Sequence, residues 1–369
     1  MGECTSISSV KFVQTRDFLD IFNDSSPQEW ISNCDVELHE IHCGEHLFPV
    51  TLNRSYYTNS YTTSFYSANI SYAKDELHLI GNPLTEWIAK ALLNGTGSIF
   101  KHFQCDNMAI INNWGFSTNF HPSLGVEEIE SLTNDAVMSF PSAYIALRSL
   151  NSLMDADLIE ALRNNGWSLL PARSVYMFDT TDTAIFKHNH TKKDQKLLSQ
   201  TPLELISPSG WMEEDFSRIK ELFDKLFIEK HSHLNPDFSA EFLRRLHQKG
   251  IIEFYGFKEN GVIVAFIGFF VAHNIISTPI LGYDTSLPQE MGLYRVLMAL
   301  LLKTAKERGL MLNLSSGAGS FKRSRGGKAT LEYTAIYAQH LSPTKRSFIR
   351  NLSKLLNRYL PDTFEKYQI

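Results

Sequence analysis

The sequence predicts an α/β protein in which helices flank mixed β-sheets, organised as two lobes. Apolar strands alternate with amphipathic helices along most of the chain, which is the pattern of α/β layer structures. With 369 residues, of which 43% are hydrophobic, the chain is long enough for two domains of ordinary size. One polar stretch, residues 179–210, interrupts the pattern and is the best candidate for a linker. We therefore expect one lobe at residues 1–195 and a second at residues 205–369.

The first lobe begins with a weakly amphipathic helix and continues as strands that alternate with helices. Its predicted strands are residues 35–42, 46–53, 107–113, 143–147 and 169–178. Its predicted helices are residues 15–23, 85–94, 126–139 and 156–165. Residues 55–72 are dense in Tyr, Ser, Thr and Asn, which is too polar for a core strand. We expect this tract to be an ordered loop or to line a polar pocket. We expect its residues 60–72, together with residues 112–119, to contact a polar ligand.

Two helices open the second lobe, and a hairpin, a strand, a helix and two further strands follow. The hairpin turns at Asn260-Gly261, because an Asn-Gly pair is the signal for a type I′ turn. The predicted helices are residues 213–230, 235–249, 293–308 and 343–359. The predicted strands are residues 251–257, 262–272, 275–283, 310–314 and 330–339.

A strand–helix–strand unit in the second lobe is the feature on which the functional prediction depends. A strand ends at Tyr283, Gly292 stands at the mouth of the following helix, and a parallel strand returns. The first N–H groups of a helix have no partner within it and its dipole is positive at that end, so an anion binds there readily. Lys322 and Arg325 follow the second strand at the carboxyl edge of the sheet, where ligand crevices open in α/β folds.

The order of elements and two motifs resemble the GNAT acyltransferase superfamily. In that fold the pyrophosphate of acyl-coenzyme A rests on backbone N–H groups of the central helix, after a loop of the form Gln/Arg-x-x-Gly-x-Gly/Ala. The segment Gln289-Glu290-Met291-Gly292-Leu293-Tyr294 matches Gln-x-x-Gly and has Tyr294 where the family has a small residue. Residues 316–326, Ser-Gly-Ala-Gly-Ser-Phe-Lys-Arg-Ser-Arg-Gly, are similar to the signature of the FemAB-related, BioF2-like acetyltransferase domain. Proteins of that group have two GNAT-like lobes in one chain.

The resemblance implies an N-acyltransferase that moves an acyl group from acyl-CoA to an amine of a small molecule or peptide. The second lobe would hold acyl-CoA, and a degenerate GNAT-like first lobe would lie on the acceptor side. The acceptor would enter between the lobes, near the loop at residues 230–235. Because no activated Cys or Ser motif occurs, direct attack by the amine is expected rather than a covalent acyl-enzyme. The donor-binding residues implied are Gln289, Gly292, Leu293, Tyr294, Ser315, Ser316, Lys322 and Arg325.

Acyl transfer to an amine needs a base for the amine proton and an acid for the leaving thiolate. Asp284, at the carboxyl end of its strand, is one candidate base. Glu332 is the other, because apolar neighbours would raise its pKa if they bury it. Tyr333 and Tyr337 are the candidate acids. The alternative for all four is a paired structural carboxylate and core tyrosines.

Two other functions stay open. The FemAB group also contains transferases that use aminoacyl-tRNA as the donor, but a net charge of −5 argues against a broad nucleic-acid surface. The C-terminal third is nevertheless locally basic, which suits a polyanionic ligand such as a nucleotide or a coenzyme. The third function is a GNAT scaffold that binds a ligand without catalysis.

We expect a cytoplasmic protein without a transmembrane segment, a disulfide framework or a metal. No run reaches about 18 apolar residues, and the N-terminus lacks the profile of a signal peptide. The four cysteines are too few for a disulfide framework. The cluster of Cys and His at residues 34–46 has a spacing unlike that of zinc sites. Met1-Gly2-Glu3-Cys4-Thr5-Ser6 fits the pattern for N-myristoylation, with a cysteine available for palmitoylation.

Overall fold

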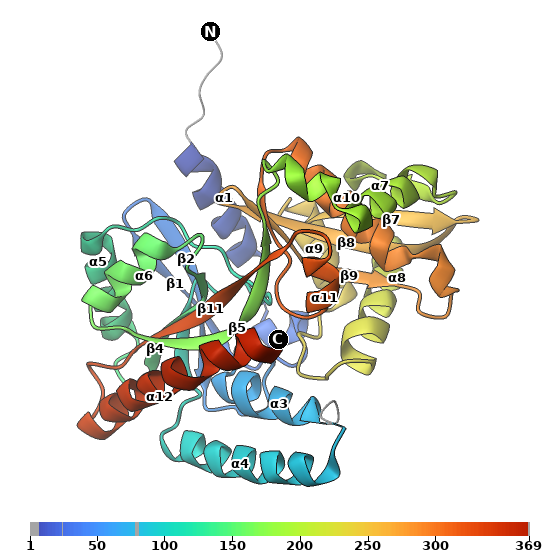
Figure 1. Ribbon diagram of the computed structural model, residues 1–369. Coiled ribbons are helices and arrows are strands. Elements are labelled where there is room, and N and C mark those ends of the chain that lie inside the picture. The colour runs from blue at the N-terminus through green and yellow to red at the C-terminus, as the bar shows by residue number, and fades with distance from the viewer. Residues whose placement is uncertain (1–6, 24, 78–80, 368–369) are drawn as a thin grey trace.

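The computed structural model describes residues 7–23, 25–77 and 81–367, and within them eleven strands form one continuous mixed sheet (Figure 1). Its strand order is β1-β2-β3-β4-β11-β5-β10-β9-β8-β7-β6. The strands are β1 (Glu37–Cys43), β2 (His46–Arg54), β3 (Asn107–Ile111), β4 (Tyr144–Asn151), β5 (Ser168–Phe178), β6 (Glu204–Ile206), β7 (Glu253–Glu259), β8 (Val262–Ala272), β9 (Ile275–Tyr283), β10 (Met311–Asn313) and β11 (Lys328–Tyr337). The predicted α/β class is confirmed. The acylation motif at residues 1–6 lies outside the described residues.

Helices cover both faces of the sheet. The α-helices are α1 (Ile7–Asp20), α2 (Pro27–Trp30), α3 (Tyr72–Asp75), α4 (Pro83–His102), α5 (Val126–Ser139), α6 (Ala156–Asn164), α7 (Asn189–Gln200), α8 (Asp215–Phe223), α9 (Ala240–Gln248), α10 (Leu293–Glu307), α11 (Gly319–Arg323) and α12 (Pro343–Tyr367). The first-half strands pack against α5 and α6 on one face, and against α4, α12 and the π-helical turn η1 (Ser67–Ser71) on the other. The second-half strands pack against α8 and α9 on one face and against α10 on the other. No helix among the described residues combines the length and the apolar character needed to cross a bilayer.

The second half follows the predicted order of elements closely. β9 has the predicted bounds, and α10 ends one residue before the predicted end. The hairpin of β7 and β8 turns at Asn260 and Gly261, which both have positive φ, as a type I′ turn requires. The helix predicted at residues 213–230 is α8 followed by the π-helical segment η5 (Asp224–Glu229).

Three segments differ from the prediction. Residues 179–210 are not an extended linker, because they contain α7, which packs along α10. α4 is about twice as long as predicted, since it continues through Gly95 and Gly97. β11 does not stay with the second-half strands: it lies between β4 and β5 and is antiparallel to both. The strands of both predicted lobes therefore form one sheet, and the lobe boundaries at residues 195 and 205 stay a prediction.

Candidate functional site

The mouth of α10 is shaped by Gly292. This residue has φ +63°, a left-handed conformation that glycine adopts at little cost, and its carbonyl accepts the N–H of Val296 at 2.9 Å. A Cβ at Gly292 would lie 2.8 Å from Cδ2 of Leu197 on α7, so the close helix packing also requires glycine. Gln289 is exposed in the short turn η6 (Gln289–Met291) that precedes the helix. The backbone N–H groups of Leu293 and Tyr294 belong to the first turn, where an anion would bind.

Next to this mouth, β9 and β10 part. They pair only over Ile275–Ser277 and Met311–Asn313. Beyond that point the chain follows β5, because the Leu314 N–H donates to the Tyr176 carbonyl at 2.9 Å. The β9 residues 280–283 pair with β8 on one side, and no strand in the described part of the chain pairs with their other edge. An extended ligand chain could hydrogen-bond to this open edge.

Unpaired polar atoms are buried where the two strands part. Ser277 and Asn313 are register partners, and each exposes 3% or less of its surface. Ser277 Oγ, Asn313 Nδ2 and the nearby Asn119 Nδ2 have no hydrogen-bond partner among the described residues. Buried polar groups in proteins are nearly always paired, so these atoms are suited to contact a ligand or water.

Lys322 and Arg325, predicted to bind phosphates, are both buried and bonded to protein groups. Lys322 Nζ donates to the carbonyls of Leu314 (2.7 Å), Ser315 (3.3 Å) and Ser316 (2.8 Å). Burial, with Arg173 as a smaller cause, lowers the pKa of Lys322 to about 7. These contacts hold the turn at residues 314–316 in place.

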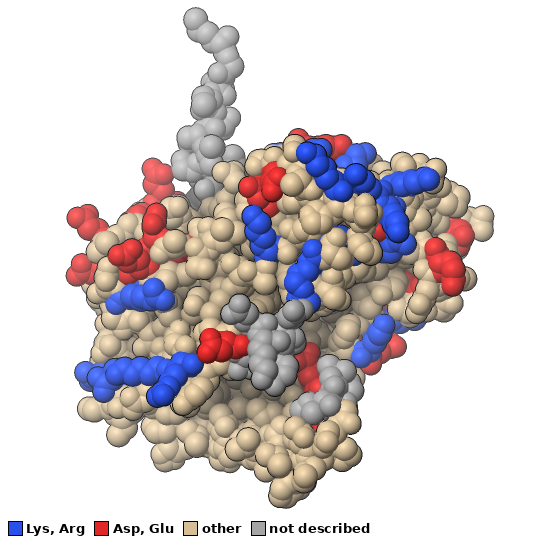
Figure 2. Space-filling model, viewed as in Figure 1, with Lys and Arg blue, Asp and Glu red and all other residues tan. Residues whose placement is uncertain are grey.

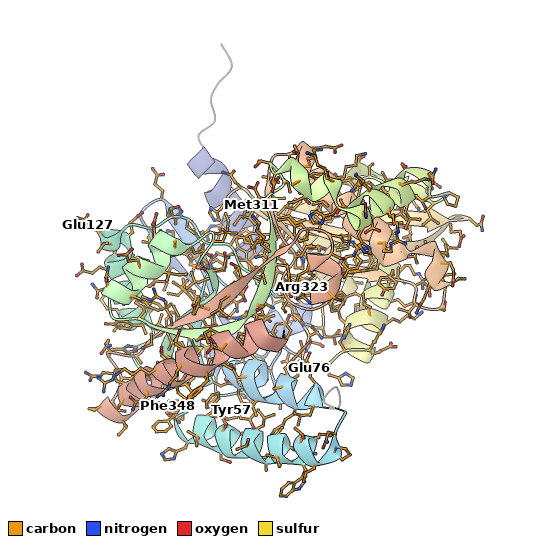
Figure 3. All side chains as sticks on the ribbon, viewed as in Figure 1. Tyr57, Glu76, Glu127, Met311, Arg323 and Phe348 are labelled. Carbon is orange, nitrogen blue, oxygen red and sulfur yellow. The ribbon has the colours of Figure 1, made fainter. Side chains whose placement is uncertain are left out.

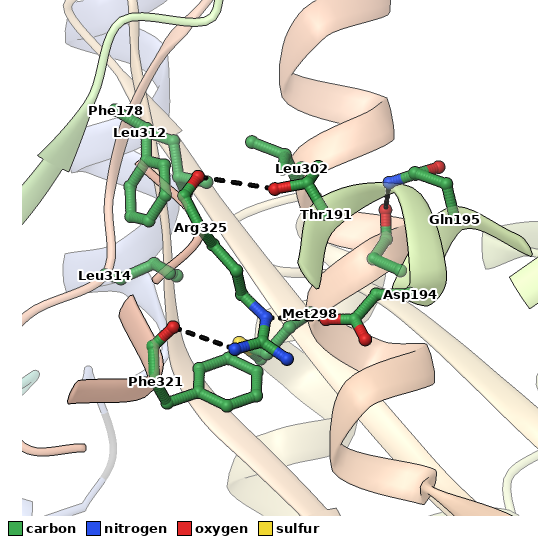
Figure 4. A pocket seen from close by; sticks show the side chains of 11 residues that line it. Phe178, Thr191, Asp194, Gln195, Met298, Leu302, Leu312, Leu314, Phe321 and Arg325 are labelled. Carbon is green, nitrogen blue, oxygen red and sulfur yellow. Dashed lines mark hydrogen bonds and ion pairs between the residues drawn. The ribbon is translucent and has the colours of Figure 1, made fainter. Parts of the chain in front are cut away.

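Arg325 joins α7 to the segment after β10. Its Nε donates to Asp194 Oδ2 at 2.5 Å and its Nη1 to the Phe321 carbonyl at 2.9 Å, while the guanidinium lies 3.3 Å from the centre of the Phe321 ring (Figure 4). Arg325 itself lines an apolar pocket between α10, β5 and β10, together with residues that include Phe178, Met298 and Leu312 (Figure 4). Arg325 is therefore committed to the protein's own groups.

A different cation lies beside the helix mouth. The side chain of Arg295 lies 3.8 Å from the position of a Cβ at Gly292, and it is 41% exposed. Its Nε donates to Asp194 Oδ1 at 2.7 Å. On the neighbouring helix α7, the exposed residues include Lys192, Lys193 and Lys196, and Figure 2 shows Lys and Arg gathered over α7 and α10. Sequence reasoning missed this basic surface because residues 179–210 were interpreted as a linker.

Three aromatic rings line the other side of the mouth. The ring centre of Tyr294 lies 6.2 Å from that of Tyr283 and 5.0 Å from that of Phe321. Burial raises the pKa of Tyr294 to about 12, so its hydroxyl stays protonated at neutral pH. Tyr294 therefore fills the place of the family's small residue with an apolar ring and a hydrogen-bond donor.

The structure does not bring the four predicted catalytic residues together. Asp284 lies on the α8 side, where it accepts from Ser286 and from Arg218 Nη2 at 2.7 Å. The Ser286 hydroxyl and Arg218 lower the pKa of Asp284 to about 2, which makes it a weak base at neutral pH. Tyr333 and Tyr337 pack against the core formed with α5 and α6. They lie on the opposite face of the sheet from Glu332.

Glu332 forms a buried salt bridge. Its side chain is 4% exposed, and Arg173 on β5 binds it with two nitrogens, Nε to Oε1 at 2.7 Å and Nη2 to Oε2 at 3.3 Å. Arg173 Nη2 also donates to the Ser117 carbonyl at 2.6 Å. This geometry is that of a carboxylate paired for structural reasons, which the sequence left open as the alternative to a catalytic base.

Three polar segments predicted to contact the acceptor meet around this salt bridge. Arg148 Nη1 donates to the Thr62 carbonyl at 2.7 Å, and the Tyr61 N–H donates to the carbonyl of Leu234 in the second half at 3.0 Å. Thr118 Oγ1 donates to Ser315 Oγ at 3.3 Å. The segments at 60–72, 112–119 and 230–235 thus converge close to the turn after β10.

This region has an excess of positive charge. In the described part of the chain, Arg148 forms no salt bridge, whereas Arg173 and Glu332 neutralise each other. Burial lowers the pKa of Arg148 to about 10, and the positive charge of the nearby Arg173 is the second cause. Burial raises the pKa of Asp155, close to Glu332, to about 7. The arrangement fits a ligand that carries an anionic group.

Three of the cysteines and the histidines of residues 34–46 lie in the described part of the chain. Cys34, Cys43 and Cys105 are buried and free, and burial raises the pKa of Cys34 to about 11, which keeps the thiol protonated. His39 and His42 each contact a glutamate on β1. Within the described ranges, no group of three or more His, Cys, Asp or Glu side chains is arranged to hold a metal ion.

Part of the second half of the chain is similar to a known protein family. Residues 186–323 match the model of the acetyltransferase (GNAT) domain. This stretch contains α7, α10, the parting of β9 and β10, and the turn after β10. The mouth of α10 and the place where β9 and β10 part therefore lie within the residues that match this model. No curated protein matches the sequence.

The chain is also similar to several solved structures. L-PGS from Bacillus licheniformis is 14% identical with a TM-score of 0.47, over 66% of this chain and 82% of that one. FemX is 11% identical with a TM-score of 0.47, over 58% of this chain and 78% of that one. A GCN5-related N-acetyltransferase from Kribbella flavida is 10% identical with a TM-score of 0.36, over 92% and 98% of the two chains.

Proposed function

We propose that the protein is an N-acyltransferase that moves an acyl group from acyl-CoA to an amine by direct attack. The observation that carries the proposal is the parting of β9 and β10 beside the mouth of α10. The gap offers a free strand edge for an extended pantetheine chain, and the first turn of α10 offers N–H groups for the pyrophosphate. Gln289 and Gly292 shape this turn, and Ser315 and Ser316 form the opposite side of the gap.

Arg295 takes the role that the sequence assigned to Lys322 and Arg325. Its side chain is 41% exposed and lies 3.8 Å from the position of a Cβ at Gly292. A guanidinium binds phosphate through paired hydrogen bonds. The exposed lysines of α7 add positive charge for the remaining phosphate of the coenzyme. Lys322 and Arg325 support the site indirectly, by fixing the turn and α7.

The thioester carbonyl is proposed to lie where the strands part. There the unpaired Asn313 Nδ2 and Ser277 Oγ would hydrogen-bond its oxygen, and would stabilise the negative charge that develops on it during attack. The amine nitrogen forms a bond to the carbonyl carbon, the C–S bond breaks, and one proton passes from nitrogen to the thiolate. The protonated Tyr294 hydroxyl beside the mouth is a suitable donor of a hydrogen bond to that sulfur.

The acceptor is proposed to enter on the face where Arg148, Arg173 and Glu332 lie. Both oxygens of Glu332 already accept hydrogen bonds from Arg173, so its role would be to orient the amine. Arg148, which has no carboxylate of its own in the described chain, favours an acceptor that also carries an anionic group.

Calorimetric titration of the purified chain with acetyl-CoA tests the donor. We expect micromolar binding that weakens about tenfold or more in Arg295→Gln, because a charge-assisted hydrogen bond contributes about 1.5–3 kcal/mol. Lys303→Gln, an exposed cation farther along the same helix, is the matched control and should bind as the wild type does. Release of free CoA thiol in the presence of amino acids and small peptides then tests transfer.

The same titration separates the other two functions. The exposed cations of α7 and Arg295 also suit the phosphates of an aminoacyl-tRNA, which is the donor in the FemAB-type alternative. Binding of tRNA without binding of acetyl-CoA would establish that alternative. Binding of neither would leave a GNAT scaffold without catalysis.

A further inference from the structure

Helix α4 presents an apolar face to solvent. The large side chains on this face expose between 46% and 69% of their surface; they are Leu84, Trp87, Ile88, Leu92 and Ile99. Their spacing of three, four or seven residues places them on one side of the helix. The other side of α4 packs inward, since a Cβ on Gly97 would lie 2.9 Å from Tyr66 Oη. A contiguous apolar surface of this kind marks an interaction site.

A basic helix adjoins this surface. α12 contacts the chain just after the end of α4. There the rings of Phe348 and Phe103 stack with their centres 4.2 Å apart, and Lys345 Nζ donates to Gln104 Oε1 at 3.0 Å. Figure 3 labels Phe348 on the side of α12 that adjoins α4. Exposed cations recur every fourth residue along α12, on one side of the helix: Arg346, Arg350, Lys354 and Arg358. Leu355 and Tyr359 are exposed beside them.

We propose that α4 and α12 together bind the surface of an anionic lipid bilayer. Trp, Leu and Ile on one side of a helix, with Lys and Arg next to them, are the composition of a helix that lies in the membrane interface. The charges are complementary, because the phosphates of the headgroups would meet the cations of α12. In Figure 2, the surface over α4 is tan, and blue atoms lie over the first turns of α12, with a red carboxylate beyond them. The single carboxylate of α4, Glu86, is not on its exposed side.

The shape of the surface favours a bilayer over a protein partner. The apolar residues form the convex ridge of one helix, which the headgroup and acyl boundary can surround. A protein partner would need a groove of matching length. This inference does not depend on the acyl donor, since none of the residues near Gly292 takes part in it.

Trp87 supplies a direct signal for the test. All five tryptophans lie in the described part of the chain, and Trp87 is the one that is mostly exposed. The full chain is mixed with vesicles of phosphatidylcholine alone, or of phosphatidylcholine with about a third phosphatidylglycerol. We expect flotation with the anionic vesicles, a blue shift of the tryptophan emission, and weaker binding at high salt.

Paired variants identify the two helices. Trp87→Ser with Leu92→Ser should lower the partition coefficient at least tenfold and remove the blue shift. Arg350→Gln with Lys354→Gln should lower binding to the anionic vesicles and reduce its dependence on salt. Met138→Ser, an exposed apolar residue of α5, is the matched control and should bind as the wild type does. All these side chains are exposed, so the variants should fold.

Three results would overturn the proposal. They are no flotation of the wild type, equal flotation of the α4 variant, and a dimer in light scattering that the α4 substitutions dissociate while vesicles are not bound. The last result would identify a second copy of the chain as the occupant of the apolar face.

Discussion

Replacing Arg173 by methionine should destabilise the protein strongly. Arg173 binds Glu332 through two nitrogens, and Glu332 exposes only 4% of its side chain. The substitution leaves a buried carboxylate without its cation, and breaking one partner of a buried pair costs about 3–5 kcal/mol. The Ser117 carbonyl also loses its donor, but that oxygen can accept from water, because Arg173 is partly exposed. We therefore expect a loss of about 3–5 kcal/mol.

Urea denaturation at pH 7, followed by circular dichroism, measures this loss. The double variant Arg173→Met with Glu332→Leu should recover most of it, since apolar residues of similar size replace a buried ion pair at little net cost. Arg54→Met is the control: Arg54 Nε lies 2.5 Å from Glu37, but both side chains are about half exposed, so the loss should be under about 1 kcal/mol. The reasoning would be refuted if Arg173→Met cost no more than Arg54→Met, or if the double variant were as unstable as the single one.

Three further measurements test other parts of the structure. Gly292→Ala should lower the free energy of unfolding, measured with urea, by at least about 1 kcal/mol and by more than Gly261→Ala does. Both glycines have positive φ, but only a Cβ at Gly292 would have a neighbour within 4 Å. An equal loss in the two variants would show that the packing against α7 does not matter. Ser277→Ala should leave the free energy of unfolding unchanged, since the Ser277 hydroxyl has no partner among the described residues. The same substitution should lower kcat about tenfold if that hydroxyl contacts the thioester. An unchanged kcat would exclude that contact. Burial raises the folded-state pKa of Asp155 to about 7, above its unfolded value, so the folded state binds more protons between about pH 4 and 7 and stability falls as pH rises through this window. Asp155→Asn should therefore raise the thermal midpoint of unfolding at pH 8, and should raise it progressively less towards pH 4. A difference between variant and wild type that stays constant with pH would contradict the shifted pKa.

Local patterns predicted the elements of the second half because their signals lie within a few residues. β9 is bounded by turns on both sides, and the Asn260-Gly261 turn fixes the hairpin before it. Gly309 follows the end of α10, as the pattern indicated. Gly292 was identified for the same reason, since a glycine just before an apolar-periodic helix has few other interpretations.

The partners of charged residues could not be predicted in this way. Arg325 was expected to face phosphates, but it binds Asp194, which is 131 residues away in the sequence. Glu332 and Arg173 are 159 residues apart. α7 was missed because the side of the helix that faces the protein includes the polar residues Thr191 and Asp194, so its apolar periodicity is weak. Such pairs become visible only when the fold brings distant segments together.

The position of β11 has a consequence for the synthesis of the protein. β4 and β5 are made early, but the strand that lies between them ends at Tyr337. Until the ribosome has added β11, each of these strands has at least one edge without hydrogen-bond partners, and such edges pair readily with other chains. Chaperones that shield exposed strand edges should therefore act on this protein throughout translation, and ribosome-bound chains that stop before residue 328 should be far more sensitive to protease than those that extend past β11.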